Sequence, residues 1–542
     1  MPTDITSQLQ TATAPVTLQA GDYSISQNVT LGHHLTMLPG ATITVPAGVT
    51  LKLISSLDAA ITQLFKGAGL VDLNKSRIAT AYAEWWGAKS NDGTFDNKGP
   101  LSAAVAGHPN VELLAADYFI NSTWKIAQSH RTVRGAGPRW SPGSQGTRIV
   151  LQGGSSHVMQ VGTDTKPSGA IENFVTAVHV SNLSLWRSAA PVSPAAGQEA
   201  NGPSGLRAQY LLYCQFEDVQ APEHSIGFSI AGCVASQFRR CTAFRSTAGS
   251  GTGNNIFFGF YLNGHVNIGL AGGNASVYLI DCAASVGGAP PLSSAAGMLL
   301  DGAFVDTFVI RFETTTIAKG IVAFGVSAST DPALRKAGNL DLHIHMPILD
   351  QCSDRGIEMG NLSNYAAVEL IDPYVALAPG ALAALHLHDG GGNVTLSGGQ
   401  FIGYGNNEAG GVGLGLLAEA QKGIRAVGTK ILGMARPVGM NACTAFDIAV
   451  DVSNPDQNAS QAAIRLEGCD RGRIVSFVRG KAGAFPQGVS LVGTGNGHVF
   501  IDATGLDPAS LTGGAGEKVR IAGSQVTTVG PVGTHYVTGV MS

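Results

Sequence analysis

The chain has 542 residues and a formal net charge of −4 at pH 7; 13% of its residues are charged, 44% are hydrophobic and 72 are glycine. A charge so close to neutral argues against a nucleic-acid-binding protein, which would show a basic stripe. Low charge and abundant glycine favour a chain of stacked strands joined by tight turns.

The seven cysteines are scattered and lack Cys-x-x-Cys spacing, which argues against a disulfide framework and a structural zinc site. We therefore expect buried thiols in a protein folded in a reducing compartment. No signal peptide and no apolar run long enough for a membrane span is evident in the sequence. It also has no Walker motif, nucleophile elbow or HExxH motif, and no cofactor is expected.

Residues 1–75 alternate short strand-like pieces, such as Val16-Thr-Leu and Tyr23-Ser-Ile, with glycine turns. This pattern predicts a small β-rich N-terminal region that serves as a cap or attaches the protein to a particle. An opening motif at 82–106 follows, in which an aromatic-glycine turn precedes a short amphipathic helix candidate.

From residue 227 onward, one phrase recurs with apolar residues in its second and fourth places and variable residues in its third and fifth. The copies are Gly227-Phe-Ser-Ile-Ala, Gly259-Phe-Tyr-Leu-Asn, Gly297-Met-Leu-Leu-Asp, Gly320-Ile-Val-Ala-Phe, Gly356-Ile-Glu-Met-Gly and Ala384-Leu-His-Leu-His. This period of two indicates strands with one buried face.

A second phrase follows, with its inward apolar residue in second place. Its copies include Tyr278-Leu-Ile-Asp-Cys, Val309-Ile-Arg-Phe-Glu and His343-Ile-His-Met-Pro. Each coil therefore supplies at least two strands, and the coils stack about 4.8 Å apart. The sequence predicts an all-β fold, a parallel β-helix over residues 76–514, with a short C-terminal β cap or trimerisation element at 515–542.

The run Glu84-Trp-Trp-Gly-Ala-Lys, with Asp92-Gly, Asp96 and the small helix, resembles the corresponding motif of pectate-lyase-like right-handed β-helix proteins. In particular it is similar to that of bacteriophage tailspikes and tail-associated polysaccharide depolymerases. The resemblance implies a right-handed helix, a homotrimer, a place in the virion tail with the N-terminal region on the tail or baseplate, and a bacterial surface polysaccharide (O-antigen or capsule) as partner.

The third and fifth places of the first phrase point outward, so the residues there are the candidates for chemistry. Rings that stack on sugars and carboxylates that transfer protons are typical of carbohydrate sites. Asp301 and Glu358 lie two coils apart, about 9–10 Å along the axis, near the upper limit for an inverting glycosidase. We predict them as the catalytic pair, with substrate bound by Tyr261, Asn263, Phe324, His386, His388 and Arg245.

Alternatives remain open at this point. Asp350 and Asp354 are a reserve pair, because the resemblance implies acidic pairs beside the strands, and Glu223 is a further reserve. On the second phrase, Arg311 beside His345 and His343 beside Glu369 fit cross-strand ion pairs, or a basic groove of a lyase that acts by β-elimination on a uronic-acid polymer. A receptor-binding spike or adhesin that holds polysaccharide without cleavage also fits.

Two His-x-His spacings, His343/His345 and His386/His388, place paired imidazoles on one strand face, and Glu358 could add a third ligand beside His386. Outward alternation produces such pairs by chance, so no metal site is predicted. The expected function is hydrolytic depolymerisation of a bacterial surface polysaccharide.

Overall fold

The computed structural model describes residues 1–139, 145–153, 155–190, 192, 194, 202–246, 256–265, 273–287, 294–325, 340–362, 366–403, 413–454 and 463–480, and strand segments at 489–492, 497–504, 509–512, 519–522, 526–528 and 536–538. The predicted C-terminal cap therefore lies mostly outside the described residues. The chain divides into two compact units, Met1–Ser229 with two short later segments and Asn254–Ser542 with two short earlier segments.

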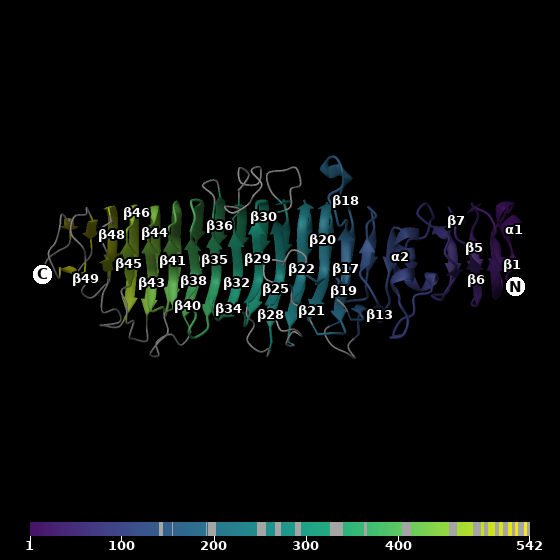
Figure 1. Ribbon diagram of the computed structural model, residues 1–542, viewed down its shortest axis with the longest axis horizontal. Helices are drawn as coiled ribbons and strands as arrows, with labels where there is room; N and C mark the ends of the chain where they lie inside the picture. Colours follow the sequence, from purple (N-terminus) through teal and green to yellow (C-terminus); the bar gives the residue numbers. More distant parts are fainter. Residues whose placement is uncertain are drawn as a thin grey trace. The chain divides into compact units, whose positions relative to one another are not determined.

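The N-terminal region is a small solenoid with three faces (purple in Figure 1). Its parallel sheets are β1-β3-β6-β9, β4-β7-β10 and β2-β5-β8, and buried residues alternate with more exposed ones in β2, β4, β5 and β7. The strands are β1 Thr3–Asp4, β2 Val16–Leu18, β3 Gly21–Ser24, β4 Val29–Leu31, β5 Leu35–Met37, β6 Ala41–Thr44, β7 Thr50–Leu53, β8 Leu57–Ala59, β9 Phe65–Lys66 and β10 Leu70–Asp72. Helix α1 (Thr6–Gln10) packs on the edge strand β4 and buries Leu9, so it covers an edge that would otherwise be open.

The first unit continues from the opening motif into a parallel ladder. The motif forms η1 (Ala83–Trp86) and α2 (Lys98–Gly107), so the predicted short helix is confirmed. The main strands are β12 Asn110–Glu112, β13 Asp117–Ile120, β14 Trp124–Ile126, β15 Thr132–Arg134, β16 Arg148–Leu151, β17 Met159–Gly162, β19 His179–Arg187, β20 Ser204–Leu212 and β21 Gln215–Pro222. The strands pair in parallel, for example β15 with β19 and β19 with β21.

In the second unit each coil contributes strands to three sheets, and all of their pairings are parallel (Figure 1). The first sheet contains β25 Ile256–Gly264, β29 Ser294–Gly302, β32 Lys319–Phe324, β35 Arg355–Gly360, β38 Ala383–His388 and β41 Leu414–Glu419. The second contains β27 Tyr278–Ile280, β30 Phe304–Ile310, β33 Leu340–His345, β36 Ala367–Ile371 and β39 Asn393–Ser397, and the third β28 Ala283–Val286, β31 Glu313–Thr315, β34 Ile348–Cys352, β37 Tyr374–Leu377 and β40 Gln400–Gly403. Longer strands, β42 Ile424–Leu432, β44 Thr444–Asn454 and β46 Asp470–Gly480, alternate with β43 Arg436–Asn441 and β45 Ile464–Glu467. The predicted parallel β-helix is confirmed.

The phrase residues predicted to point inward form the core of these coils. In β35, Ile357 and Met359 have no exposed surface, and the second and fourth places of the other copies are equally buried. The turns at the end of the second phrase use left-handed backbone at one column of residues. Asp281, Arg311, Met346 and Asp372 have φ between 47° and 54°. Tight turns of this kind let strands of constant length stack while the longer loops vary.

All seven cysteines are buried, as predicted, and none forms a disulfide bond, so they act as small core residues. Among the described residues, no helix is long and apolar enough to cross a membrane.

Glu84 of the opening motif is a buried carboxyl group, and burial disfavours its ionised form. Its side chain accepts a hydrogen bond of 2.5 Å from the Tyr118 hydroxyl, while Oε2 has no hydrogen-bond partner among the described residues. Burial raises the pKa of Glu84, and the hydrogen bond from Tyr118 offsets only part of that rise.

The pKa of Glu84 is higher in the folded chain than in the unfolded chain, so the protonated form favours folding. This contribution to the free energy of unfolding is fully present below the unfolded pKa and is lost as the pH rises through the folded pKa. We expect Glu84→Gln to become progressively more stable than the parent chain as the pH is raised from 4 to 8. Urea unfolding at a series of pH values measures this difference. Parallel stability curves for the two proteins would contradict it.

Candidate functional site

The outward columns of the first sheet are in the register that the phrase alignment predicted. The third-place column runs Tyr261, Leu299, Val322, Glu358 and His386, and the fifth-place column runs Asn263, Asp301, Phe324, Gly360 and His388. Much of this surface is covered, however. Tyr261, Glu358 and His386 are 2%, 5% and 6% exposed, whereas the side chains of Asp301 and His388 are 35% and 19% exposed.

Glu358 lies at the centre of a dense ion-pair network. Its Oε2 is 2.5 Å from Lys319 Nζ, and its Oε1 is 3.6 Å from Arg355 Nε and 3.5 Å from His388 Nε2. Burial alone would raise the pKa of Glu358, but the hydrogen bond and charge of Lys319, with Arg355 and His388, outweigh it and lower the pKa below its usual value. Glu358 is therefore held as a carboxylate.

Asp354, named in the reserve pair, joins the same network. It is 2.6 Å from Arg355 Nη1 and 3.9 Å from Lys319 Nζ. Because Lys319 Nζ touches both acids, at 2.5 and 3.9 Å, the nearer oxygens of Glu358 and Asp354 are separated by no more than the sum of those distances, about 6.4 Å. Asp350, the other reserve residue, lies on β34 in the third sheet.

The predicted site residues include neither cation of this network. Lys319 and Arg355 each directly precede the glycine that begins a phrase, and the register places them side by side. A search of the position before each phrase would have found them, because residues of like position stack in neighbouring coils.

His386 links the network to a carboxylate on the next strand. Arg355 Nε donates to His386 Nδ1 at 2.9 Å, and His386 Nε2 lies 2.9 Å from Glu419 Oε2. Burial lowers the pKa of His386, although the hydrogen bond with Glu419 opposes that shift. A neutral ring whose Nε2 carries the proton fits both contacts, because Nδ1 must accept from the guanidinium.

The ring of His388 lies over Gly360. A Cβ at residue 360 would be 2.4 Å from His388 Cε1, so only glycine leaves room for the ring in this position. The His388 ring also packs edge-on against Phe324, with centroids 6.0 Å apart. Gly360 therefore permits His388 to reach Glu358.

Asp301 and Glu358 lie two strands apart, as predicted, but the structure does not bring their side chains together. The two residues are separated by two strands and also by two places along the strand, so their Cα atoms are about 12 Å apart. Their side chains also turn to different partners. Asp301 accepts from Tyr261 at 3.4 Å and lies 2.9 Å from His265 Nε2, while Glu358 turns to Lys319.

The hydrogen bond with Asp301 raises the pKa of His265, against the opposing effect of burial. The stability of this pair is fully present below the unfolded pKa of the histidine and is lost as pH rises through the raised folded pKa. We expect Asp301→Asn to lower the pKa of His265 toward 6.5. An NMR titration of histidine-labelled protein measures the change; an unaltered pKa in Asp301→Asn would contradict the pairing.

Three remaining candidates lie away from this network. Arg245 is completely buried and donates a hydrogen bond to the carbonyl of Ile256, so it presents no exposed surface in this structure. Glu223 belongs to the first compact unit and occupies a turn with φ 61°. Asn263 is 9% exposed and accepts from the backbone N–H of His265.

Three rings stack on the second sheet, and the predicted alignment of the second phrase did not place them side by side. Tyr278 stacks on Phe308 at 5.0 Å, and Phe308 stacks on His343 at 4.5 Å, with interplanar angles of 6° and 8°. The register pairs Val309 with Leu279 and Ile344, so the predicted alignment of Val309 with His343, and of Arg311 with His345, was wrong by one residue. Arg311 instead occupies the turn and pairs with Asp281 at 2.5 Å.

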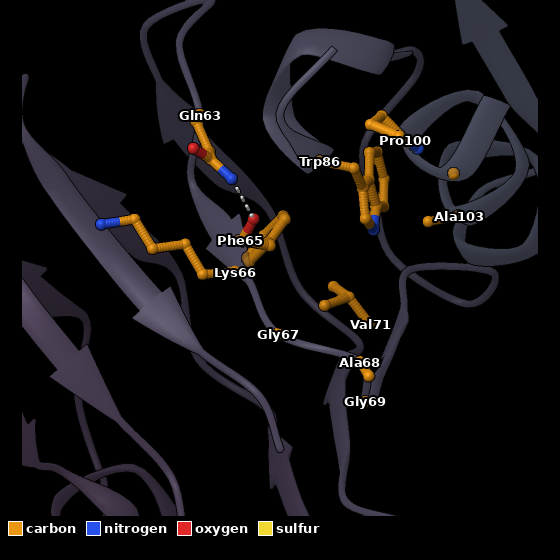
Figure 2. A pocket seen from close by; sticks show the side chains of 11 residues that line it. Gln63, Phe65, Lys66, Gly67, Ala68, Gly69, Val71, Trp86, Pro100 and Ala103 are labelled. Atoms are coloured by element: carbon orange, nitrogen blue, oxygen red, sulfur yellow. Dashed lines mark hydrogen bonds between the residues drawn. The ribbon is translucent and has the colours of Figure 1, made fainter. Parts of the chain in front are cut away.

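A pocket of about 410 Å³ lies in the first unit beside the opening motif (Figure 2). Phe65, Trp86 and the loop Gly67-Ala68-Gly69 line it, together with Pro100 and Ala103 of α2. Lys66 is its one ionisable lining residue, and Lys66 pairs with Asp22 at 2.7 Å. This pocket therefore lacks the acid and base groups that the Glu358 network provides.

No protein-family model matches the sequence, and no curated protein matches it. Among solved structures, the chain is similar to bacteriophage CBA120 tailspike protein 3, with 11% identity and a TM-score of 0.45; the match covers 85% of this chain and 61% of that one. It is also similar to the pre-mature gene product 12 of bacteriophage phi29, with 11% identity, a TM-score of 0.48, and coverage of 82% and 68%.

A third similar structure is the A-module of the Azotobacter vinelandii mannuronan C-5 epimerase AlgE6, with 12% identity, a TM-score of 0.36, and coverage of 84% and 99%. At such identities the likeness concerns only the fold.

Proposed function

We propose that this protein binds a bacterial surface polysaccharide on the first sheet of its second unit and hydrolyses it. Glu358 is the ionised carboxylate of the reaction, and Asp354, whose side chain is 36% exposed, is the proton donor. Tyr261, Asp301 and His265 form a second polar group on the same sheet, where a further sugar unit of the polysaccharide binds.

The observation that carries this proposal is the convergence of Glu358 and Asp354 on Lys319 and Arg355. Glycoside hydrolysis needs two carboxyl groups, about 5–5.5 Å apart for retention of configuration and about 6.5–9.5 Å apart for inversion. The nearer oxygens of Glu358 and Asp354 are at most about 6.4 Å apart, which is closer than most inverting pairs, so we expect retention. The lowered pKa of Glu358 suits the nucleophile.

In this mechanism a Glu358 oxygen bonds to the anomeric carbon as the glycosidic bond breaks, and a proton from solvent passes through the carboxyl group of Asp354 to the departing oxygen. Water then adds to the anomeric carbon and releases Glu358, while Asp354 takes the proton of that water. The release of Glu358 restores the ion pair with Lys319, which favours the carboxylate form.

Hydrolysis fits this network better than β-elimination. A lyase uses free cations to neutralise the carboxylate of a uronic acid, but Lys319 and Arg355 already pair with Glu358 and Asp354. The resemblance of the opening motif adds to the proposal that the protein works as a homotrimer in a virion tail, attached through residues 1–75. Light scattering of the purified chain tests the trimer.

Incubation with a panel of bacterial polysaccharides tests the proposed activity. Hydrolysis gives shortened oligosaccharides whose mass includes one added water and that carry no new ultraviolet absorbance. An unsaturated, ultraviolet-absorbing product would assign a lyase instead. Retained binding to a polysaccharide that stays intact would assign a non-catalytic spike or adhesin. For a cleaved polymer, NMR of the fresh product reports retention or inversion.

A further inference from the structure

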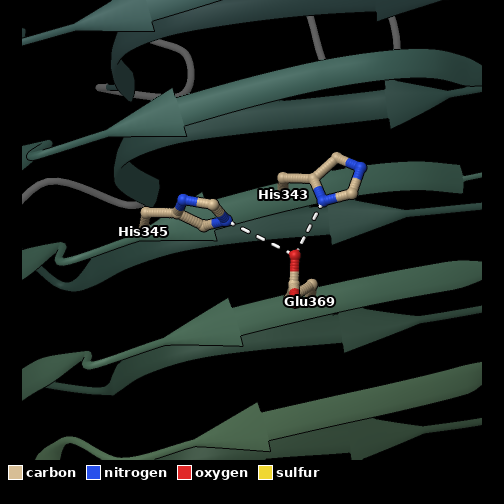
Figure 3. Close-up of side chains that lie close together, drawn as sticks. All are labelled: His343, His345 and Glu369. Atoms are coloured by element: carbon tan, nitrogen blue, oxygen red, sulfur yellow. Dashed lines mark hydrogen bonds and ion pairs between the residues drawn. The ribbon is translucent and has the colours of Figure 1, made fainter.

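Two histidines of β33 and one carboxylate of β36 face a single point on the second sheet. His343 and His345 are two residues apart and so lie on one side of β33, and the register places Glu369 beside His343. Glu369 Oε2 lies 2.9 Å from His343 Nδ1 and 3.4 Å from His345 Nε2, and Figure 3 shows both rings directed at the same oxygen. We propose that His343, His345 and Glu369 bind a divalent transition-metal ion, with Zn²⁺ the best match.

The distances between the donor atoms suit a small tetrahedral ion. Ligands bound to Zn²⁺ at about 2.0–2.1 Å in tetrahedral geometry are about 3.4 Å from one another. The three donor atoms lie within 4.8 Å of one another, so small side-chain rotations bring them to bonding distance. Two imidazoles and one carboxylate leave the fourth position to water, and nitrogen donors favour Zn²⁺ over Mg²⁺ or Ca²⁺.

The neighbouring residues hold the histidine rings in place. His343 is fixed by its stack on Phe308, and its Nε2 lies 3.3 Å from Asp341 Oδ1. A carboxylate behind a histidine ligand orients the ring and increases its basicity. His345 Nε2 is buried, and its contact with Glu369 lacks hydrogen-bond geometry, so this nitrogen has no hydrogen-bond partner among the described residues.

Binding exchanges a proton for the ion. A proton between His343 Nδ1 and Glu369 Oε2 forms their hydrogen bond. The ion takes the place of that proton at Nδ1, the ring carries its proton on Nε2 beside Asp341 Oδ1, and the Nδ1 lone pair then bonds to the metal. The acidic group of Asp341, which contacts His343, favours a cation at this point.

A second group of two histidines and one glutamate is less suited to bind a metal ion. Glu358, His386 and His388 also bring their donor atoms within 4.8 Å, but Lys319 Nζ is 2.5 Å from Glu358 and Arg355 donates to His386 Nδ1. These cations occupy the donors and repel a metal ion. Among the described residues, no lysine or arginine pairs with Glu369. The neighbouring charges therefore favour metal binding at His343, His345 and Glu369 over binding at the second group.

Equilibrium dialysis of the full chain against micromolar Zn²⁺, followed by metal analysis, tests the site. We expect about one tightly bound ion per chain, and His345→Gln and Glu369→Gln each to weaken binding at least about tenfold. Circular dichroism confirms that the variants are folded. Co²⁺ in place of Zn²⁺ is expected to show the visible bands of a four-coordinate ion, which disappear in Glu369→Gln.

His179→Gln is the matched control, because His179 lies 3.8 Å from Glu217 on the neighbouring strand without a second histidine, and it should bind Zn²⁺ as the parent chain does. Glu358→Gln should also retain the ion while it loses polysaccharide cleavage. Equal Zn²⁺ affinity in the parent chain, His345→Gln and Glu369→Gln, or no retained ion in the parent chain, would overturn the proposal. Neither result bears on the proposed hydrolase.

Discussion

Glu358→Gln and Asp354→Asn are each expected to lower the rate of polysaccharide cleavage by about 10²–10⁴-fold. The first change removes the carboxylate that bonds to the anomeric carbon, and the second removes the donor of the proton to the departing oxygen. Both substitutions keep the size of the side chain. Initial rates of oligosaccharide release on a polymer that the parent chain cleaves measure the effect.

Asp350→Asn is the matched control, since Asp350 is four residues from Asp354 but lies on the third sheet. Its cleavage rate should equal that of the parent chain.

Glu358 also pairs with Lys319 and Arg355, so a loss of structure must be separated from a loss of catalysis. Polysaccharide affinity and circular dichroism make that separation. A folded Glu358→Gln protein that cleaves at the parent rate would refute the catalytic assignment.

Gly356→Ala is expected to destabilise the second unit by about 3 kcal/mol, because an added methyl group has no room in this core. A Cβ at Gly356 would lie 2.1 Å from Val375 Cγ1 and 2.7 Å from the carbonyl oxygen of Ala384 in the next coil. The methyl group would push two coils apart, and the backbone oxygen cannot rotate away. The midpoint of guanidinium-induced unfolding measures this loss.

Gly99→Ala provides the contrast within the same chain. Gly99 lies in α2, and a Cβ there would meet no atom within 4 Å. Alanine favours the helix by about 0.5 kcal/mol over glycine, so the variant should unfold at a slightly higher guanidinium concentration. A loss of stability in Gly99→Ala that matched the loss in Gly356→Ala would show that crowding at Gly356 is not the cause.

The sequence alone was enough to predict the β-helix and the register of its first sheet. Alternation of apolar residues reports which side chains are buried, and it is a local property of each strand. The third-place column from Tyr261 to His386 therefore aligned correctly without a structure. The same reasoning failed at Val309, where Val309 and Ile310 are both apolar and either fits the inward place; the slip concealed the stack of Phe308 on His343.

What the sequence left undecided was which outward groups meet. The phrase alignment placed Asp301 and Glu358 on one face, but the hydrogen bonds of Asp301 turn toward Tyr261 and His265 while Glu358 turns toward Lys319. Side-chain direction depends on partners from other coils, and so do burial and pKa. Strand order and inward faces thus follow from local pattern. In contrast, Lys319 joins Glu358 and Asp354, and Glu369 joins His343 and His345, only because stacking brings residues of neighbouring coils into contact.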